Sequence, residues 1–229
     1  MQFKSIANPL WNPWANDKAL LELYQKRCRQ LVPEMTCASQ AAQILSSKIN
    51  GNETLLDAGC GAGYYFWSFY NRKIPIEYFG IDYTPEMIEL AKQEMCNSKS
   101  KLKSTNFILN TIENIEKEYD NIICFNVLTN NPHYALPLER LLKCTKKRLL
   151  LRENLDQNLV VRYTHDLYID KDKTHIKVYH NTYPIDEVEK FIENYGFKVT
   201  RILDERSKGN IEMVVDVPHR WQILLAEKI

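Results

Sequence analysis

A carboxylate followed by closely spaced glycines is the first feature of the chain that could bind a ligand. In the stretch LLDAGCGAGYY, Asp57 comes two residues before Gly59, and Gly61 and Gly63 follow at alternate positions. Glycines at this spacing let the backbone turn sharply and approach a ligand closely. A second acid, Asp82, follows about 20 residues after the turn, where a carboxylate can accept hydrogen bonds from ribose hydroxyls. The two acids and the turn predict a ligand that contains a ribose.

The glycine spacing separates this turn from a dinucleotide-binding motif. A G-x-G-x-x-G motif would have its third glycine where Tyr64 stands, and it has no acid two residues before its first glycine. The ribose ligand is therefore not expected to carry a pyrophosphate, and a nicotinamide-dependent oxidoreductase is disfavoured.

Apolar runs alternate with segments of helical periodicity, which indicates a parallel sheet covered by helices on both faces. Asp57 and Asp82 each come at the end of such a run, so both carboxylates are expected at the carboxyl edge of the sheet. The predicted strands cover residues 53–59, 78–82, 105–110, 120–128 and 147–153, and the predicted helices cover residues 15–32, 36–49, 85–95 and 134–145.

The alternation changes after the fifth predicted strand. The elements predicted there are an inserted hairpin of residues 158–169 and 174–183, a helix over 185–195, and strands over 197–203 and 221–229, the last one antiparallel. The basic run KCTKKR, residues 143–148, is expected to be a solvated helix end.

Composition and charge exclude several classes of protein. The chain has 229 residues, of which 45% are hydrophobic and 26% charged, as in an ordinary globular domain. A net charge of +1 gives no basic field for a nucleic acid, so none is expected as a partner. The six cysteines form no C-x-x-C pair, so they are expected to be reduced and no metal site is predicted. No apolar segment reaches the roughly 18 residues of a membrane span, so no membrane partner and a cytoplasmic location are expected.

The acidic glycine turn and the second acid resemble the motifs of class I S-adenosylmethionine-dependent methyltransferases, over roughly residues 50–150. The resemblance implies S-adenosyl-L-methionine as cofactor and an α/β, Rossmann-like fold. That fold is a seven-stranded, mostly parallel sheet with helices on both faces, here with a hairpin inserted after strand five. A single methyltransferase domain over 1–229 is expected, consisting of an N-terminal helical lid (1–49), a cofactor-binding core (50–153), an inserted substrate cap (154–183) and C-terminal strands with a helix (184–229).

The resemblance also assigns cofactor contacts to residues near the strand ends. Gly59 and Gly61 would admit the amino-acid end of the cofactor, Asp57 would lie near its ammonium group, and Asp82 would accept from the ribose diol. The remaining implied cofactor-binding residues are Tyr83 against the adenine, Thr111 and Ile112 after the third strand, where the acid typical of the family is missing, and Asn126 at the end of the fourth.

The methyl acceptor is expected under the N-terminal segment and the insertion, because the shared core explains neither. Tyr24 and Arg27 of the first, with Arg162 and Tyr183 of the second, are predicted to bind substrate. His180 is predicted to be the catalytic base that takes the proton of a hydroxyl acceptor. The competing interpretation is a helix packed on the sheet and a solvated strand face.

The function that these residues favour is O-methylation of a small-molecule acceptor. A general likeness to methyltransferases of surface-polysaccharide biosynthesis suggests a sugar, a nucleotide-sugar or a phosphoryl group. Two alternatives stay open: a small-molecule N-methyltransferase, and a non-catalytic protein that binds S-adenosylmethionine. The sequence leaves the oligomeric state unknown.

Overall fold

The computed structural model describes residue 14 and residues 18–96, 99–165 and 177–229. The α-helices are α1 (Lys18–Cys28), α2 (Thr36–Ser46), α3 (Phe66–Asn71), α4 (Pro85–Met95), α5 (Ala135–Cys144) and α6 (Ile185–Glu193). The strands are β1 (Glu53–Ala58), β2 (Ile76–Asp82), β3 (Phe107–Leu109), β4 (Tyr119–Phe125), β5 (Thr145–Asp156), β6 (Tyr163–His165), β7 (Lys177–Tyr179), β8 (Tyr183–Pro184), β9 (Phe197–Ile202), β10 (Glu212–Val214), β11 (Val217–His219) and β12 (Trp221–Lys228). The 3-10 helices are η2 (Ser104–Asn106), η3 (Ile112–Asn114) and η4 (Leu128–Asn130).

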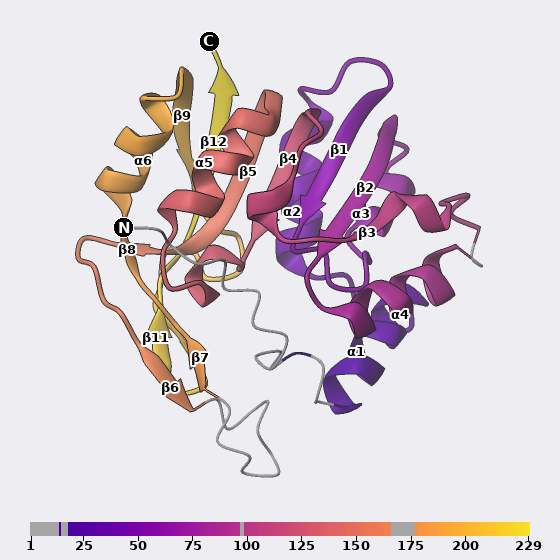
Figure 1. The fold of residues 1–229 in the computed structure, drawn as a ribbon, viewed down its shortest axis with the longest axis horizontal. Helices are drawn as coiled ribbons and strands as arrows, with labels where there is room; N and C mark the ends of the chain where they lie inside the picture. The colour runs from indigo at the N-terminus through magenta and orange to yellow at the C-terminus, as the bar shows by residue number, and fades with distance from the viewer. Residues whose placement is uncertain (1–13, 15–17, 97–98, 166–176) are drawn as a thin grey trace.

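One sheet runs through the molecule in the order β3-β2-β1-β4-β5-β12-β9 (Figure 1). Strands β1 to β5 pair in parallel. Strand β12 lies antiparallel between β5 and β9, and the short β8 adds to β5. The predicted α/β fold is therefore confirmed, and so is the reversed direction of the last strand.

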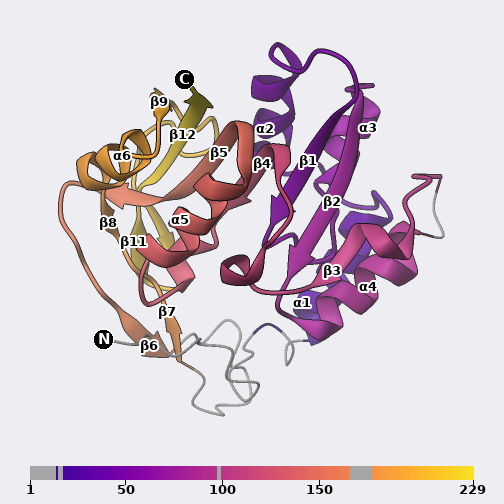
Figure 2. The same ribbon diagram turned by 45° about the horizontal axis from the view of Figure 1, so that its top comes forward.

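Neighbouring residues of the central strands pack into two separate cores. Leu55 of β1 packs with residues of α2 and α3, and the next residue, Leu56, packs with residues of α5 and α6. Leu150 and Leu151 of β5 divide in the same way. Because successive side chains of a strand point to opposite faces, both faces of this apolar sheet must be covered. Figures 1 and 2 show α5 and α6 on one face and α2 and α3 on the other.

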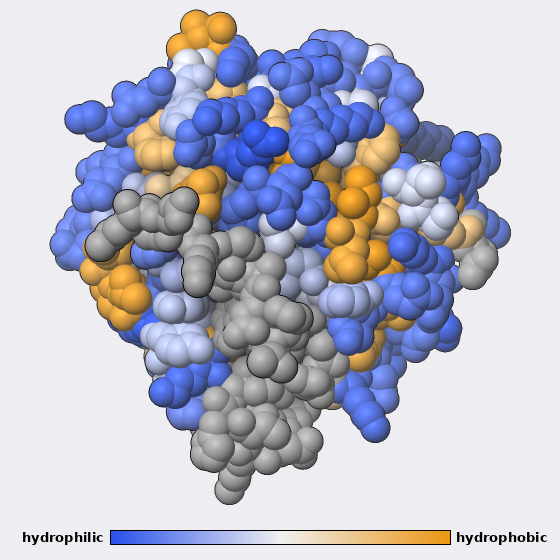
Figure 3. Space-filling view, in the orientation of Figure 1, coloured by the Kyte–Doolittle hydropathy of each residue, from blue (hydrophilic) through white to orange (hydrophobic). Residues whose placement is uncertain are grey.

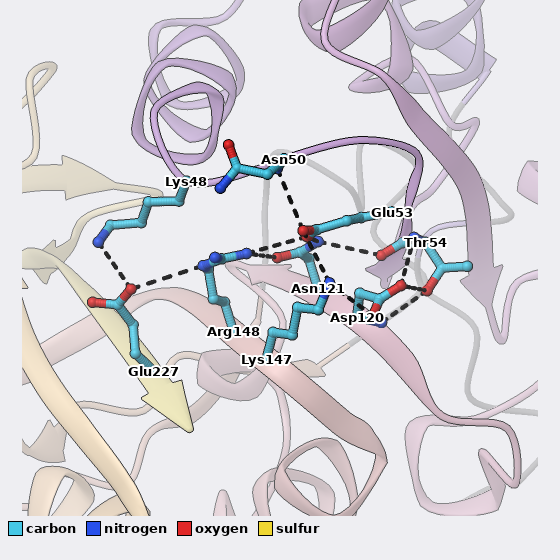
Figure 4. Close-up of polar contacts among 9 residues, drawn as sticks. All are labelled: Lys48, Asn50, Glu53, Thr54, Asp120, Asn121, Lys147, Arg148 and Glu227. Atoms are coloured by element: carbon cyan, nitrogen blue, oxygen red, sulfur yellow. Dashed lines mark hydrogen bonds and ion pairs between the residues drawn. The ribbon is translucent and has the colours of Figure 1, made fainter. Parts of the chain in front are cut away.

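A polar cluster closes the edge of the sheet where β1 begins (Figure 4). Glu53 is almost fully buried, and its carboxylate lies 3.0 Å from Lys147 Nζ and 3.1 Å from Arg148 Nη1. The expected solvated helix end over 143–148 holds only in part: Lys143 lies in the last turn of α5 and is exposed, but β5 begins at Thr145, so the run from there on belongs to a strand. Carboxylates on the neighbouring strands hold the basic side chains of Lys147 and Arg148 against the sheet.

Within the residues that the structure describes, the insertion after β5 is paired over only part of the predicted hairpin. Strands β6 and β7 pair antiparallel over three residues each, with Tyr163 opposite Tyr179. Closer to the sheet, Val160 pairs with Thr182 in an isolated bridge. The predicted turn of the hairpin lies outside the described residues.

Two elements are absent from the sequence prediction, α3 and the β10–β11 hairpin. Val215 and Asp216 connect β10 to β11 with positive φ angles of 49° and 60°. Such angles suit a tight two-residue hairpin turn, but that turn is usually marked by Gly or Asn. Because Val215 stands at the first position of this turn, the sequence contains no signal for the hairpin.

The face of the molecule in Figure 3 is mainly polar where its residues are described. Side chains on the face in Figure 3 are mostly hydrophilic, and the hydrophobic ones form small, separate groups. Within the described part of the chain, no helix is both long enough and apolar enough to cross a membrane.

Candidate functional site

A cavity of about 440 Å³ lies at the carboxyl edge of the sheet, and a volume of this size is typical of small-molecule sites. It is lined by residues from the ends of β1, β2 and β4, from β5, and from α1, the β10–β11 hairpin and β12. The sequence-predicted residues among them are Tyr24, Arg27, Asp57, Gly59, Gly61, Asp82, Tyr83, Thr111, Ile112, Asn126 and His180.

The glycine turn after β1 is held against β2 and packed by protein side chains. The backbone N–H groups of Gly59 and Cys60 both donate to the carbonyl oxygen of Ile81 at 2.9 Å. Gly59 has φ +79°, and a Cβ there would lie 2.4 Å from a methyl carbon of Val127. Gly61 has φ +52°, and a Cβ there would lie 2.6 Å from the ring of Tyr24. The absence of a side chain at these two glycines is therefore already required by Val127, in the loop after β4, and by Tyr24 of α1. A ligand that approaches the turn would add a further reason.

Asp57 is a buried acid among the residues that line the cavity. Its Oδ2 accepts a hydrogen bond of 2.6 Å from the hydroxyl of Tyr78. Burial raises the pKa of Asp57 to about 7, against the effect of the Tyr78 hydrogen bond and with a further contribution from the charge of Asp82. A cation in the cavity would favour the ionised form.

Asp82 organises the glycine turn. Its Oδ2 accepts from the N–H of Gly61 and its Oδ1 from the N–H of Thr84, both at 2.8 Å. Burial raises the pKa of Asp82, although these N–H groups oppose the shift. Each carboxylate oxygen still has lone pairs for a ligand hydroxyl. The predicted ribose contact therefore stays a prediction, and a structural role is added to it.

The residues predicted to surround the adenine lie together at the β2 and β3 side of the cavity. Tyr83 is about one-third exposed, and Ile112 is buried. Thr111 is the residue before η3, and its backbone N–H is bound by the side chain of Asn110. These residues form a partly apolar wall.

At the end of β4, Asn126 is tied to β5. It has a left-handed φ of 60°, a conformation that asparagine tolerates better than most residues. Its backbone N–H donates to the carbonyl of Arg152 at 2.7 Å, and its side-chain oxygen accepts from Arg152 Nη1. Arg152 is 2% exposed, and its Nε donates to Asp204 at 2.6 Å.

Glu153, the residue after Arg152, anchors the loop that follows β4. Its fully buried carboxylate accepts from the backbone N–H groups of Val127, Leu128 and Thr129 at 2.8–2.9 Å. The Thr129 hydroxyl donates to it as well. Burial raises the pKa of Glu153 against these hydrogen bonds. The carboxylate thus fixes the loop that carries Asn126 and Val127.

Two histidines and a tryptophan form the wall on the β12 side. His180 is 4% exposed, and its ring lies edge-to-face with His219 at 5.7 Å between centroids. His219 stacks on Trp221 at 4.8 Å. The Nδ1 of His219 lies 2.9 Å from the carbonyl of Val217, which can only accept, so Nδ1 carries the proton and Nε2 the lone pair. Burial lowers the pKa of His219 to about 4, and nearby positive charges add to this.

The structure does not bring Tyr183 or Arg162 to the cavity, because neither is among the described residues that line it. The Tyr183 hydroxyl donates to the carbonyl of Asn131 at 2.6 Å in the core. Tyr183 follows His180 by an odd number of residues, so an extended chain turns the two side chains to opposite faces. Arg162 lies near Thr182, with 3.4 Å between Nη1 and Oγ1.

Tyr24 and Arg27 lie on α1, next to the glycine turn that follows β1. The Arg27 guanidinium lies over the rings of Tyr24 and Tyr64, at 5.3 and 5.1 Å from their centroids, and donates to the Tyr64 hydroxyl at 3.2 Å. Both residues line the cavity, so the structure places this part of the N-terminal segment beside the glycine turn.

The sequence analysis did not single out Arg152, Glu153, His219 or Trp221. The sequence did contain a signal for Arg152 and Glu153. The strand sequence KRLLLRE ends with these two charged residues, at the edge of the sheet where ligands bind. All six cysteines are free. Among the described residues, no group of three or more His, Cys, Asp and Glu side chains could hold a metal ion.

Comparisons with known proteins agree on the fold. Residues 49–207 match the family model of the methyltransferase domain. Magnesium protoporphyrin IX methyltransferase from Synechocystis, solved with bound S-adenosylhomocysteine, is 17% identical with a TM-score of 0.61, and the match covers 93% of this chain and 100% of that one. A Burkholderia thailandensis 1,6-didemethyltoxoflavin N1-methyltransferase is 16% identical with a TM-score of 0.55, and the match covers 84% of this chain and 79% of that one. A putative S-adenosylmethionine-dependent methyltransferase from Listeria monocytogenes is 16% identical with a TM-score of 0.57, and the match covers 85% of this chain and 100% of that one. No curated protein matches the chain.

Proposed function

The chain belongs to the methyltransferase-domain family, and from this premise we propose that it transfers a methyl group from S-adenosylmethionine to an oxygen atom of a small polar acceptor. The observation that carries the proposal is the pair of buried acids, Asp57 and Asp82, beside the glycine turn in one cavity. Two carboxyl groups with raised pKa values in one cavity favour a cationic ligand, and S-adenosylmethionine carries a sulfonium and an ammonium group.

The residues present fit this cofactor. Asp57 would lie near the ammonium group, Gly59 and Gly61 near the methionine backbone, and Asp82 at the ribose diol. Tyr83, Thr111 and Ile112 would line the adenine, and Asn126 the methionine part. When bound, the cofactor supplies an electrophilic methyl group.

The remaining chemistry belongs to the chain. Displacement at a methyl carbon requires an aligned nucleophile, and a hydroxyl nucleophile must also lose its proton. His180 is the residue that we propose for this proton transfer, since it lines the cavity and an imidazole nitrogen can accept a proton. Tyr24 and Arg27 are proposed to contact the acceptor from α1.

The acceptor is proposed from the chemistry of the residues that line the cavity. A sugar, a nucleotide-sugar or a phosphoryl group of surface-polysaccharide biosynthesis is proposed as the acceptor, because Asn126, Asn131 and Arg152 add hydrogen-bonding groups to the lining of the cavity. The structural neighbours named for a porphyrin and a toxoflavin precursor are also methyltransferases of small molecules. We further propose a cytoplasmic location, which the six free cysteines support, and the division into lid, core, cap and C-terminal strands given above.

Two alternatives remain distinguishable. An N-methyltransferase of a charged amine would need an acid near the acceptor, but the lining acids, Asp57, Asp82 and Glu113, all belong to the side of β1, β2 and β3. A non-catalytic binding protein would bind the cofactor without turnover.

Calorimetry and a labelled-methyl assay test the proposal together. We expect S-adenosylmethionine and S-adenosylhomocysteine to bind and NAD not to bind. Transfer of labelled methyl to small molecules of a cell extract would support an enzyme. Cofactor binding without transfer in extracts that supply acceptors would favour the non-catalytic alternative, and preferential binding of NAD would contradict the proposal.

A further inference from the structure

We propose that Arg152 forms an oxyanion subsite in the cavity and that the methyl acceptor carries a carboxylate or phosphoryl group that binds there. This inference rests on the proposed function, because it names the class of molecule that shares the cavity with the methyl donor. It adds a binding residue that the sequence motifs do not indicate.

Two of the three nitrogens of the Arg152 guanidinium group are bound by described side chains, and one is not. Its Nε is used by Asp204, and its Nη1 by the side chain of Asn126. Its Nη2 is buried and has no hydrogen-bond partner among the residues that the structure describes. Buried cationic N–H groups are seldom left without an acceptor, because the lost hydration is not replaced. Since Arg152 lines the cavity, a ligand oxygen is the available partner.

The group is also held in place before any ligand binds. The guanidinium carbon lies 4.4 Å from the centroid of the Trp221 ring. Asp204 is itself fixed, because its Oδ1 accepts the N–H of Ser207 at 2.8 Å. A preorganised guanidinium loses little conformational entropy on binding, so a single free nitrogen can still select for an oxyanion.

The position of Arg152 separates this subsite from the acids of the cofactor side. In the order of the sheet, β4 with Asn126 lies between β1, which carries Asp57, and β5, which carries Arg152.

Charge follows the same division. The arginines that line the cavity away from α1 are Arg152 and Arg206, and no described acid lines it there. Asp204 and Glu212 pair with these two arginines but do not line the cavity, so the described charged groups that an acceptor would meet there are cationic N–H donors.

The test uses the smallest anions, so that the unknown skeleton of the acceptor does not matter. Protein saturated with S-adenosylhomocysteine is titrated with acetate, inorganic phosphate and acetamide, and binding is followed by NMR at the indole N–H of Trp221. Acetamide has the shape of acetate without its charge. We expect acetate or phosphate to bind at least about tenfold more tightly than acetamide. The tighter of the two anions tells a carboxylate acceptor from a phosphoryl one.

Variants assign the binding to Arg152. Arg152→Gln should weaken anion binding about tenfold or more. The titrations are made at saturating S-adenosylhomocysteine, because the same change also removes the hydrogen bond that Arg152 donates to Asn126, which is proposed to line the cofactor. Because that change leaves Asp204 buried without its cation, the double variant Arg152→Gln, Asp204→Asn keeps a neutral hydrogen-bonding pair if the single variant does not fold. Arg201→Gln is the matched control, since Arg201 is half exposed and pairs with Asp186 and Glu189 on the surface.

Equal affinity for acetate and acetamide, absence of anion binding, or unchanged anion binding in both Arg152 variants would overturn the subsite. Failure of S-adenosylhomocysteine to bind would instead contradict the proposed function, and the anion titrations of the free protein would still decide the subsite.

Discussion

The hydroxyl of Tyr78 donates a hydrogen bond of 2.6 Å to the carboxylate of Asp57, and both residues are buried on adjacent parallel strands. The acid at the start of the glycine turn is therefore part of the sheet's interior as well as of the cavity. Its protonation should couple the binding of a cation to pH.

Donor affinity should rise with pH. The pKa of Asp57 is raised to about 7, whereas an unfolded aspartate has a pKa of about 3.9. Protonated Asp57 therefore stabilises the ligand-free folded protein relative to the unfolded chain. This contribution is fully present below pH ~3.9 and is lost as the pH rises through about 7. A bound cation favours the carboxylate, so S-adenosylmethionine should bind more tightly across this window and release a proton. Calorimetry in buffers of different ionisation heat measures that proton. Asp57→Asn should reduce this release, and unchanged release in the variant would assign the proton to another group, such as Asp82, whose pKa burial also raises.

Asp82→Ala should weaken S-adenosylhomocysteine binding by about 1–3 kcal/mol, because a charge-assisted hydrogen bond to the ribose diol is lost. The same change removes the acceptor for the N–H groups of Gly61 and Thr84, so the glycine turn should exchange its amide protons faster. Calorimetry and hydrogen exchange separate the two effects. Faster exchange with unchanged affinity would mean that Asp82 has only the structural role.

Gly61→Ala should reduce donor affinity while Gly51→Ala does not. Both glycines have positive φ angles, +52° and +86°, so both substitutions introduce backbone strain. Only the Cβ at position 61 would collide with a neighbour, the Tyr24 ring, since nothing lies within 4 Å at position 51. Comparing the two variants by calorimetry and thermal unfolding isolates the contact. Equal donor affinity in both would show that the Tyr24 contact is not needed for binding.

His180→Ala should lower turnover by about a hundredfold or more if His180 takes the acceptor proton, with donor affinity nearly unchanged. His219→Ala is the comparison, because the His219 ring lines the same wall of the cavity. The pKa of His219 is lowered to about 4, so its ring is a weak base near neutral pH and its loss is expected to change turnover less. Turnover against pH for both variants decides the assignment. A larger loss in His219→Ala would move the base to that residue.

Glu153→Gln should destabilise the fold by about 1–3 kcal/mol, because an amide cannot replace a carboxylate that accepts from three backbone N–H groups and a hydroxyl. Thermal unfolding measures the loss. Glu227→Gln, at the opposite edge of the sheet and partly exposed, is the control and should change stability much less. Similar stabilities for the two variants would show that the loop after β4 does not depend on Glu153.

Sequence patterns predicted the elements that depend on local chemistry. Helix α4 begins at Pro85 and ends at Met95 as its sequence indicates, and the strand ends place Asp57 and Asp82 at one cavity. The wall on the β12 side was not predictable, because Arg152 and His219 come together only through the pairing of β5 with β12 and through a hairpin turn without glycine. Tyr183 was predicted to bind substrate from its place in the insertion, but it is buried in the core and its hydroxyl donates to the carbonyl of Asn131.

The placement of β12 between β5 and β9 also determines when the cavity can be assembled during folding. Leu225 of β12 lies opposite Thr200 of β9 and opposite Leu150 of β5, and the second pair is much farther apart in the chain. Closing the longer loop costs more entropy, so β9 and β12 are expected to pair first and to dock onto β5 together. Trp221 then reaches Arg152 only in this late step. A chain in which β12 has not docked onto β5 would still carry Asp57 and Asp82 at the ends of β1 and β2, and it would lack the wall formed by His219 and Trp221.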